Sequence, residues 1–171
     1  MKQKLFVTLA TLCALGLSAC KSVDVDSNGA IANEYVSTLN NYEGSYAGSL
    51  LITRSNEIGT TSRIVSKNFK LTLNNVGNRP LLGSNLDILG AGCGSKIGKL
   101  LSLQVGGAWD FVAQFDFNPG ACAELATGNY VTVYGNKNKA LFVLKKDAYQ
   151  TSLPGRTGTE TLKYQSNLKK L

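Results

Sequence analysis

From Tyr42 onward, apolar and polar residues alternate along most of the chain. The pattern is clearest in the segments 65–73, 101–105 and 109–117. In the last segment, one face carries the apolar residues Trp109, Phe111, Ala113, Phe115 and Phe117, and the opposite face carries Asp110, Val112, Gln114 and Asp116. A period of two over this length is typical of antiparallel strands that are buried on one face.

Turn residues divide the alternating pattern into short strands. Gly106-Gly107 predicts a tight hairpin, and Gly135-Asn136-Lys137-Asn138 predicts a second one. No long helix is expected after residue 43. About eight short strands predict an all-β fold, either a small antiparallel β-barrel or a two-sheet β-sandwich. The other expected features are turns at 74–78 and 118–120, strands at 44–54, 130–134, 140–145 and 160–164, and a helical turn at 121–126.

The first twenty residues have the layout of an export signal. Lys2 and Lys4 precede an apolar run, residues 5–17, which is shorter than the ~20 residues needed to span a bilayer. The following residues, Leu17-Ser18-Ala19-Cys20, resemble the lipobox of bacterial lipoproteins. This resemblance implies cleavage before Cys20, a diacylglyceryl group on its thiol and an acyl chain on its new amino group. The alternative is an ordinary signal that leaves Cys20 as a plain thiol.

The resemblance also implies a location. Several acyl chains hold a protein firmly, because each buried methylene contributes about 0.8 kcal/mol. In these lipoproteins an Asp after the cysteine often marks retention in the inner membrane, whereas this chain has Lys21. We therefore expect a protein of the cell envelope, lipid-anchored in the outer membrane. The predicted organisation is a signal peptide (1–19), a lipid-anchored tether (20–43), a β domain (44–165) and a C-terminal tail (166–171).

The tether is polar and is expected to be flexible, with a short helix inside it. Ile31, Tyr35, Val36 and Leu39 fall at helical spacing, which predicts a helix over residues 29–40 with Ser27 or Asn28 as its N-cap.

The same segment partly matches a calcium-binding loop. Asp24, Asp26 and Asn28 supply oxygen atoms at alternate positions, and Gly29 follows at the sharp turn. The second half does not match, because Tyr35 stands where such loops carry a bidentate Glu. The metal hypothesis therefore competes with a polar segment that leads into a capped helix.

A second resemblance concerns the start of the β domain. Gly44-Ser45-Tyr46-Ala47-Gly48, followed by the strand 69–73, is similar to the opening of bacterial lipocalin-like barrels. It implies a barrel whose floor is plugged by the aromatic residue of the Gly-x-aromatic motif, here Tyr46. The interior is then either a pocket, lined by Phe111, Phe115 and their neighbours, or a filled core, because eight strands can enclose either.

Of the four cysteines in the chain, two are expected to remain available for a disulfide after export. Cys13 leaves with the signal and Cys20 takes the lipid, which leaves Cys93 and Cys122 in an oxidising compartment. We predict a disulfide between them, worth about 3–4 kcal/mol on the entropic model. A reactive thiol pair is the alternative, but the chain has no Cys-x-x-Cys motif and no histidine to lower a thiol pKa.

Charge narrows the possible partners. Residues 1–19 hold two of the 18 basic residues and none of the 11 acidic ones, which leaves the mature chain at +5. This favours anionic envelope surfaces, while nucleic acid is not expected in an exported compartment. Lysines gather near the second hairpin and near the C-terminus: Lys137, Lys139, Lys145 and Lys146, and Lys163, Lys169 and Lys170, with Tyr130 and Tyr134 nearby.

The absence of histidine excludes Ser–His and Cys–His nucleophiles and the usual zinc sites. We therefore expect no enzymatic activity and no cofactor. The first hypothesis is a binding module for a small apolar or amphiphilic ligand or an anionic envelope component. The alternative is a structural or interaction lipoprotein that packs against an envelope protein or polymer. An inhibitor of lysozyme or of proteases is a further alternative, although a basic protein would repel the mostly basic lysozymes.

Overall fold

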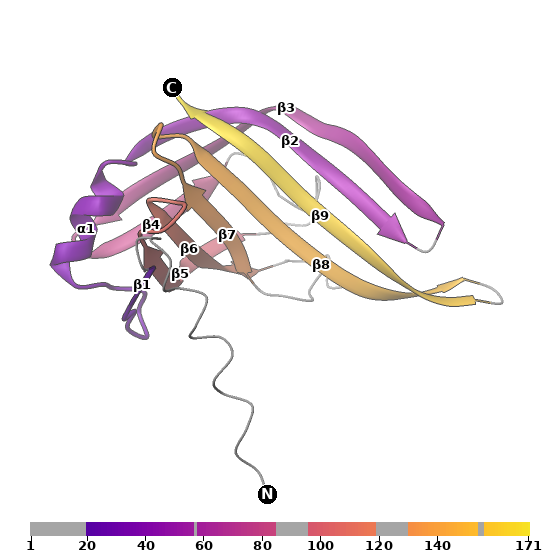
Figure 1. Ribbon diagram of the computed structural model, residues 1–171, viewed down its shortest axis with the longest axis horizontal. Coiled ribbons are helices and arrows are strands. Elements are labelled where there is room, and N and C mark those ends of the chain that lie inside the picture. Colours follow the sequence, from indigo (N-terminus) through magenta and orange to yellow (C-terminus); the bar gives the residue numbers. More distant parts are fainter. Residues whose placement is uncertain (1–19, 57, 85–95, 119–129, 154–155) are drawn as a thin grey trace, which may run out of the picture.

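The computed structural model describes residues 20–171 except 57, 85–95, 119–129 and 154–155. Strands dominate the described residues, and a single helix precedes most of them (Figure 1). The elements are β1 (Lys21–Val23), α1 (Asn33–Asn40), β2 (Gly44–Asn56), β3 (Gly59–Val76), β4 (Arg79–Ser84), β5 (Lys96–Val105), β6 (Phe111–Asn118), β7 (Tyr130–Gly135), β8 (Leu141–Leu153) and β9 (Arg156–Lys170).

In the described part of the chain, eight strands close into an antiparallel barrel. Their order is β5-β4-β3-β2-β9-β8-β7-β6, and β6 pairs again with β5. Most neighbours are successive strands, whereas the pairing of β2 with β9 joins the two ends of the domain. β4 and β5 share one register pair, Leu81 with Lys99, and β1 adds to the same edge of β5 through Lys21 and Val105. The predicted lipocalin-like barrel is confirmed, and the sandwich alternative is wrong.

Strand β6 shows why the alternation predicted the barrel. Its burial follows the period of two, with Phe111, Ala113, Phe115 and Phe117 buried and the residues between them half-exposed. Two details of the prediction are wrong. Trp109 lies outside β6 and not on its buried face, and the hairpin is a five-residue turn closed by a hydrogen bond from the Gly106 N–H to the Asp110 carbonyl.

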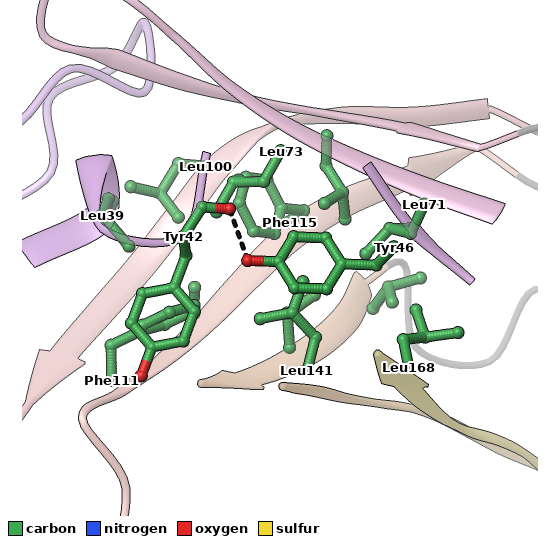
Figure 2. Close-up of a cluster of buried hydrophobic side chains, with 14 of the residues drawn as sticks. Leu39, Tyr42, Tyr46, Leu71, Leu73, Leu100, Phe111, Phe115, Leu141 and Leu168 are labelled. Carbon is green, nitrogen blue, oxygen red and sulfur yellow. Dashed lines mark hydrogen bonds between the residues drawn. The ribbon is translucent and has the colours of Figure 1, made fainter. Parts of the chain in front are cut away.

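Side chains fill the barrel interior beside α1 (Figure 2). Tyr42 and Tyr46 are fully buried there, and the Tyr46 hydroxyl donates to the Tyr42 carbonyl oxygen at 2.8 Å. Tyr46 is therefore part of the core, and its expected role as a plug of the barrel floor stays a prediction. The labelled residues around the two tyrosines are Leu39, Leu71, Leu73, Leu100, Phe111, Phe115, Leu141 and Leu168, all nearly or fully inaccessible to solvent. At this end the interior is a packed core.

Four strands continue past the rest of the barrel at the end away from α1 (Figure 1). β3 pairs with β4 only from Leu71 onward, and β7 pairs with β8 only up to Leu144. Beyond these residues β2, β3, β8 and β9 remain paired with one another, and the β8–β9 pairing extends to Leu153 and Arg156. We call this part, residues 51–56, 58–64, 145–153 and 156–163, the projecting sheet.

The chain ends differ from the prediction. Residues 21–31 are not a free tether, because Lys21–Val23 pairs with β5 and Val25 pairs with Ile31. Val23 and Ile31 are buried, and this burial holds the segment on the barrel. The expected tail, residues 166–171, continues β9 to Lys170, with Ser166 and Leu168 buried.

The helix also starts later than expected. It begins at Asn33 after Ala32, whose side chain makes no capping hydrogen bond, so the predicted N-cap at Ser27 or Asn28 is wrong. Those two residues belong instead to the turn between Val25 and Ile31.

Candidate functional site around Cys20

Cys20 lies at the end of the barrel that α1 covers. Its thiol is exposed and free, and its Sγ lies 3.5 Å from the Gly106 carbonyl oxygen in the turn between β5 and β6. The next residue, Lys21, already pairs with Val105 of β5. The predicted lipid-attachment atom is therefore joined to the barrel without an intervening linker.

The partial calcium motif forms a tight turn. The Asp26 carboxylate accepts hydrogen bonds from the backbone N–H groups of Asn28 and Ala30, both at 2.8 Å. These donors, Ala30 first, lower the pKa of the Asp26 carboxyl. Gly29 has φ +81°, and a Cβ there would lie 3.0 Å from the Leu100 backbone nitrogen, so close packing on β5 requires glycine.

This turn accounts for the residue types without a metal ion. One oxygen of Asp26 serves the two backbone amides, while Asp24 and Asn28 are exposed. Among the described residues, no three His, Cys, Asp or Glu side chains gather into a potential metal site. The calcium hypothesis therefore gains no support from the arrangement.

Tyr42 joins the end of α1 to two hairpin turns. Its hydroxyl lies 2.5 Å from the Asp110 carboxylate and 2.5 Å from the Asn136 carbonyl oxygen, so these two acceptors share the single hydrogen of the phenol. Burial, followed by the hydrogen bond to Asp110, raises the pKa of Tyr42. Lys139 completes the contact, with its Nζ 4.9 Å from the Tyr42 ring centre and 3.9 Å from the Asp110 carboxylate. The phenol stays protonated and acts as a structural connection.

Three aromatic rings cluster on the outer wall next to this connection. Trp109 lies 5.1 Å from Tyr134 and 6.4 Å from Phe142, and Tyr134 lies 5.6 Å from Phe142, all between ring centres. Tyr134 and Phe142 are register partners on β7 and β8, and Tyr134 is opposite Val112 of β6. We call Trp109, Tyr134 and Phe142 the aromatic cluster.

The aromatic cluster was not predicted, because Trp109 was expected on the same face as the buried residues of β6. A signal was nevertheless present. The buried neighbours Val133 and Leu141 show that Tyr134 and Phe142 fall on the outward positions of two strands that one hairpin joins. Aromatic residues at facing outward positions pack against each other across antiparallel strands.

The predicted lysines separate into two regions. Lys137 and Lys139 lie in the turn between β7 and β8, and Lys169 and Lys170 pair with Ala47 and Tyr46 at the start of β2, so these four belong to the α1 end. The other three belong to the projecting sheet, where Lys145 and Lys146 pair with Tyr164 and Lys163.

Cys93 and Cys122 lie outside the described residues, as does the expected helical turn at 121–126. The disulfide between the two cysteines therefore stays a prediction.

Three comparisons with known proteins gave no match: no family model, no curated protein and no solved structure matches the chain. Where the structure describes the chain, it contains no helix of sufficient length and hydrophobicity for a membrane span. The residues around Cys20 and the arrangement of the barrel are therefore the observations that bear on function.

Proposed function

We propose that this protein is a non-catalytic binding module of the bacterial cell envelope, anchored in the outer membrane by acyl chains on Cys20. One observation carries the proposal. Cys20 lies at the filled, helix-covered end of the barrel, and the projecting sheet leaves the opposite end (Figure 1). A domain built in this way keeps one end at the membrane and presents the other end to the space beyond it.

The polar groups near Cys20 support a non-catalytic role. The Tyr42 phenol, the Asp110 carboxylate and the Asp26 carboxylate are all engaged in hydrogen bonds that hold turns together. With no histidine in the chain, the commonest general base is also missing.

Two kinds of partner fit this proposal. A small apolar or amphiphilic ligand would have to enter the barrel from the end of the projecting sheet, because packed side chains occupy the interior near α1. An envelope protein or an anionic polymer would instead bind the projecting sheet itself.

A specific observation favours the second kind, and with it a structural or interaction lipoprotein. The hairpin between β2 and β3 ends in Ile58, which is 82% exposed. Its N–H, like that of Gly59, donates to the Asn56 side chain, and these two hydrogen bonds fix the backbone that presents this apolar residue.

The first experiment is mass spectrometry of the full chain purified from bacterial membranes. The denatured mass should equal that of residues 20–171 plus acyl groups, and Cys20→Ala should lose the added acyl mass. A chain with no acyl mass contradicts the anchor. Under native conditions, a discrete additional mass that is lost on denaturation would identify a small ligand.

The second experiment tests the projecting sheet by photo-crosslinking in intact cells. A photoreactive residue replaces Ile58 at the projecting tip, and a matched variant carries it at Val76, which is 62% exposed near α1. We expect a discrete envelope adduct from position 58 and none from position 76. The binding proposal fails if neither position gives an adduct and the native mass shows no ligand.

A further inference from the structure

The aromatic cluster leaves a partly apolar surface on the outer wall of the barrel. Its three rings contact one another and are only partly buried, unlike Phe111 and Leu141 on the inner faces of the same strands. Core packing therefore does not account for their outward position. Rings with an apolar body and a polar tip, such as Trp and Tyr, favour the boundary between lipid and water.

The aromatic cluster lies close to the predicted lipid. The Sγ of Cys20 contacts the carbonyl of Gly106, and Trp109 belongs to the same five-residue turn. Because β1 begins at Lys21 and pairs with β5, no flexible segment separates the acyl chains from this turn. Any membrane that holds Cys20 is therefore within reach of Trp109.

Basic side chains surround the same surface. Lys137 and Lys139 are exposed in the turn that joins Tyr134 to Phe142, and Lys21 is exposed beside Cys20. The acidic residue of the Trp109 turn, Asp110, already contacts Tyr42 and Lys139. A lysine near an anionic leaflet contributes about 1 kcal/mol, so the charge of this surface suits anionic headgroups.

We propose that Trp109, Tyr134 and Phe142, together with Lys137, form a surface that docks onto the anionic phospholipid leaflet holding the Cys20 anchor. The inference rests on the lipid attachment proposed above. Docking fixes the tilt of the barrel relative to the membrane, whereas an anchor alone would let the domain rotate about Cys20. The orientation of the projecting sheet relative to the membrane is then fixed by the structure of the barrel.

Trp109 is the only tryptophan of the chain, so it reports on its own surroundings. The acylated full chain is reconstituted into vesicles of phosphatidylethanolamine and phosphatidylglycerol, and its acyl mass is checked in the same sample. We expect a blue-shifted emission, quenching by phospholipids brominated near the top of their acyl chains, and protection from aqueous iodide. Protection should weaken in phosphatidylcholine vesicles and at high salt, because both reduce the attraction of lysine to the surface.

A matched pair of variants tests the charge. Lys137→Gln should lower the ratio of docked to undocked protein about fivefold, the factor that corresponds to one lysine near an anionic surface. Lys67→Gln removes an equally exposed lysine from β3, outside the aromatic surface, and should leave the ratio unchanged. Equal effects of the two variants would overturn the assigned surface.

The remaining outcomes separate this inference from the anchor. A chain without acyl mass overturns the lipid attachment and this inference with it. An acylated chain whose Trp109 stays open to iodide and unquenched by brominated lipid overturns the docking alone. Protection in native membranes but not in pure lipid vesicles would assign the surface to a protein partner, and would also overturn membrane docking.

Discussion

Replacing Gly135 by alanine tests how tightly the barrel is packed beside α1. Gly135 is buried and is the register partner of Phe111. A Cβ at this position would lie 2.2 Å from Cε1 and 2.5 Å from Cδ1 of the Phe111 ring. Because carbon atoms pack best about 3.5–4.0 Å apart, the ring would have to move by roughly 1.3 Å or more.

The ring has little room to move. Phe111 is fully buried. Its ring packs against the Tyr42 ring in an edge-to-face arrangement, with the ring centres 4.9 Å apart. Overpacking a core costs about 1–3 kcal/mol, and the reduced freedom of the unfolded chain returns about 0.4–1 kcal/mol. We expect Gly135→Ala to lower the free energy of unfolding by about 1–2 kcal/mol.

Urea unfolding, followed by circular dichroism, measures this change. With an m-value of about 2 kcal/mol/M, the midpoint should fall by about 0.5–1 M while m stays constant. Gly83→Ala is the matched control, because its Cβ would have only the Thr72 carbonyl oxygen nearby, at 4.0 Å. That variant should be neutral or up to about 1 kcal/mol more stable.

A double-mutant cycle with Phe111→Leu identifies the cause. The smaller side chain leaves space for a methyl group, so Gly135→Ala should cost clearly less in the Phe111→Leu background than in the wild type. If the midpoint falls equally in both backgrounds, or does not fall at all, the ring is not the obstacle and the packing argument is refuted.

Three further predictions concern hydrogen bonds at the same end. Tyr46→Phe removes the donor to the Tyr42 carbonyl inside the core and should cost about 1–2 kcal/mol in urea unfolding; an unchanged midpoint would contradict the role of this bond. Burial and the Asp110 hydrogen bond raise the pKa of Tyr42, so its contribution is complete below pH 10.0, the ordinary tyrosine value, and is lost as pH rises further. The decline of stability above that pH should be shallower in Tyr42→Phe than in the wild type. The lowered pKa of Asp26 means that its turn is stable above the ordinary aspartate value of 3.8 and weakens as pH falls below it. Amide-exchange protection of Asn28 and Ala30 should therefore drop in Asp26→Ala but persist in Asp26→Asn, which keeps an acceptor oxygen; equal loss in both would show that the charge matters more than the hydrogen bonds.

The barrel was predictable because its strands are buried on one face only. The regular alternation in β6 and in the second half of β3 follows directly from that burial. The burial of Tyr46 was also expected, through the resemblance to lipocalin-like barrels. Local pattern is informative wherever neighbouring residues experience opposite environments.

The errors arise where distant residues decide the structure. Residues 21–31 are polar and look like a tether, but β5 offers them an unpaired edge and a site for Val23 that no local pattern reveals. Residues 166–170 look like a basic tail, yet two of them, Ser166 and Leu168, are buried between β2 and β8. In the sequence, Trp109 continues the apolar alternation of β6. In the structure, it belongs to the turn that precedes this strand.

The pairing of β2 with β9 has a consequence for how the protein is made. Ser166 donates a hydrogen bond to the carbonyl oxygen of Ser49, 117 residues earlier in the chain. β9 is the last of the barrel strands along the chain. Until residue 170 has emerged, both β2 and β8 keep an open edge that can recruit another chain. Contacts between such distant residues form slowly. We therefore expect the barrel to close only after residue 170 is available for pairing, with the interval before closure as its period of greatest risk of aggregation.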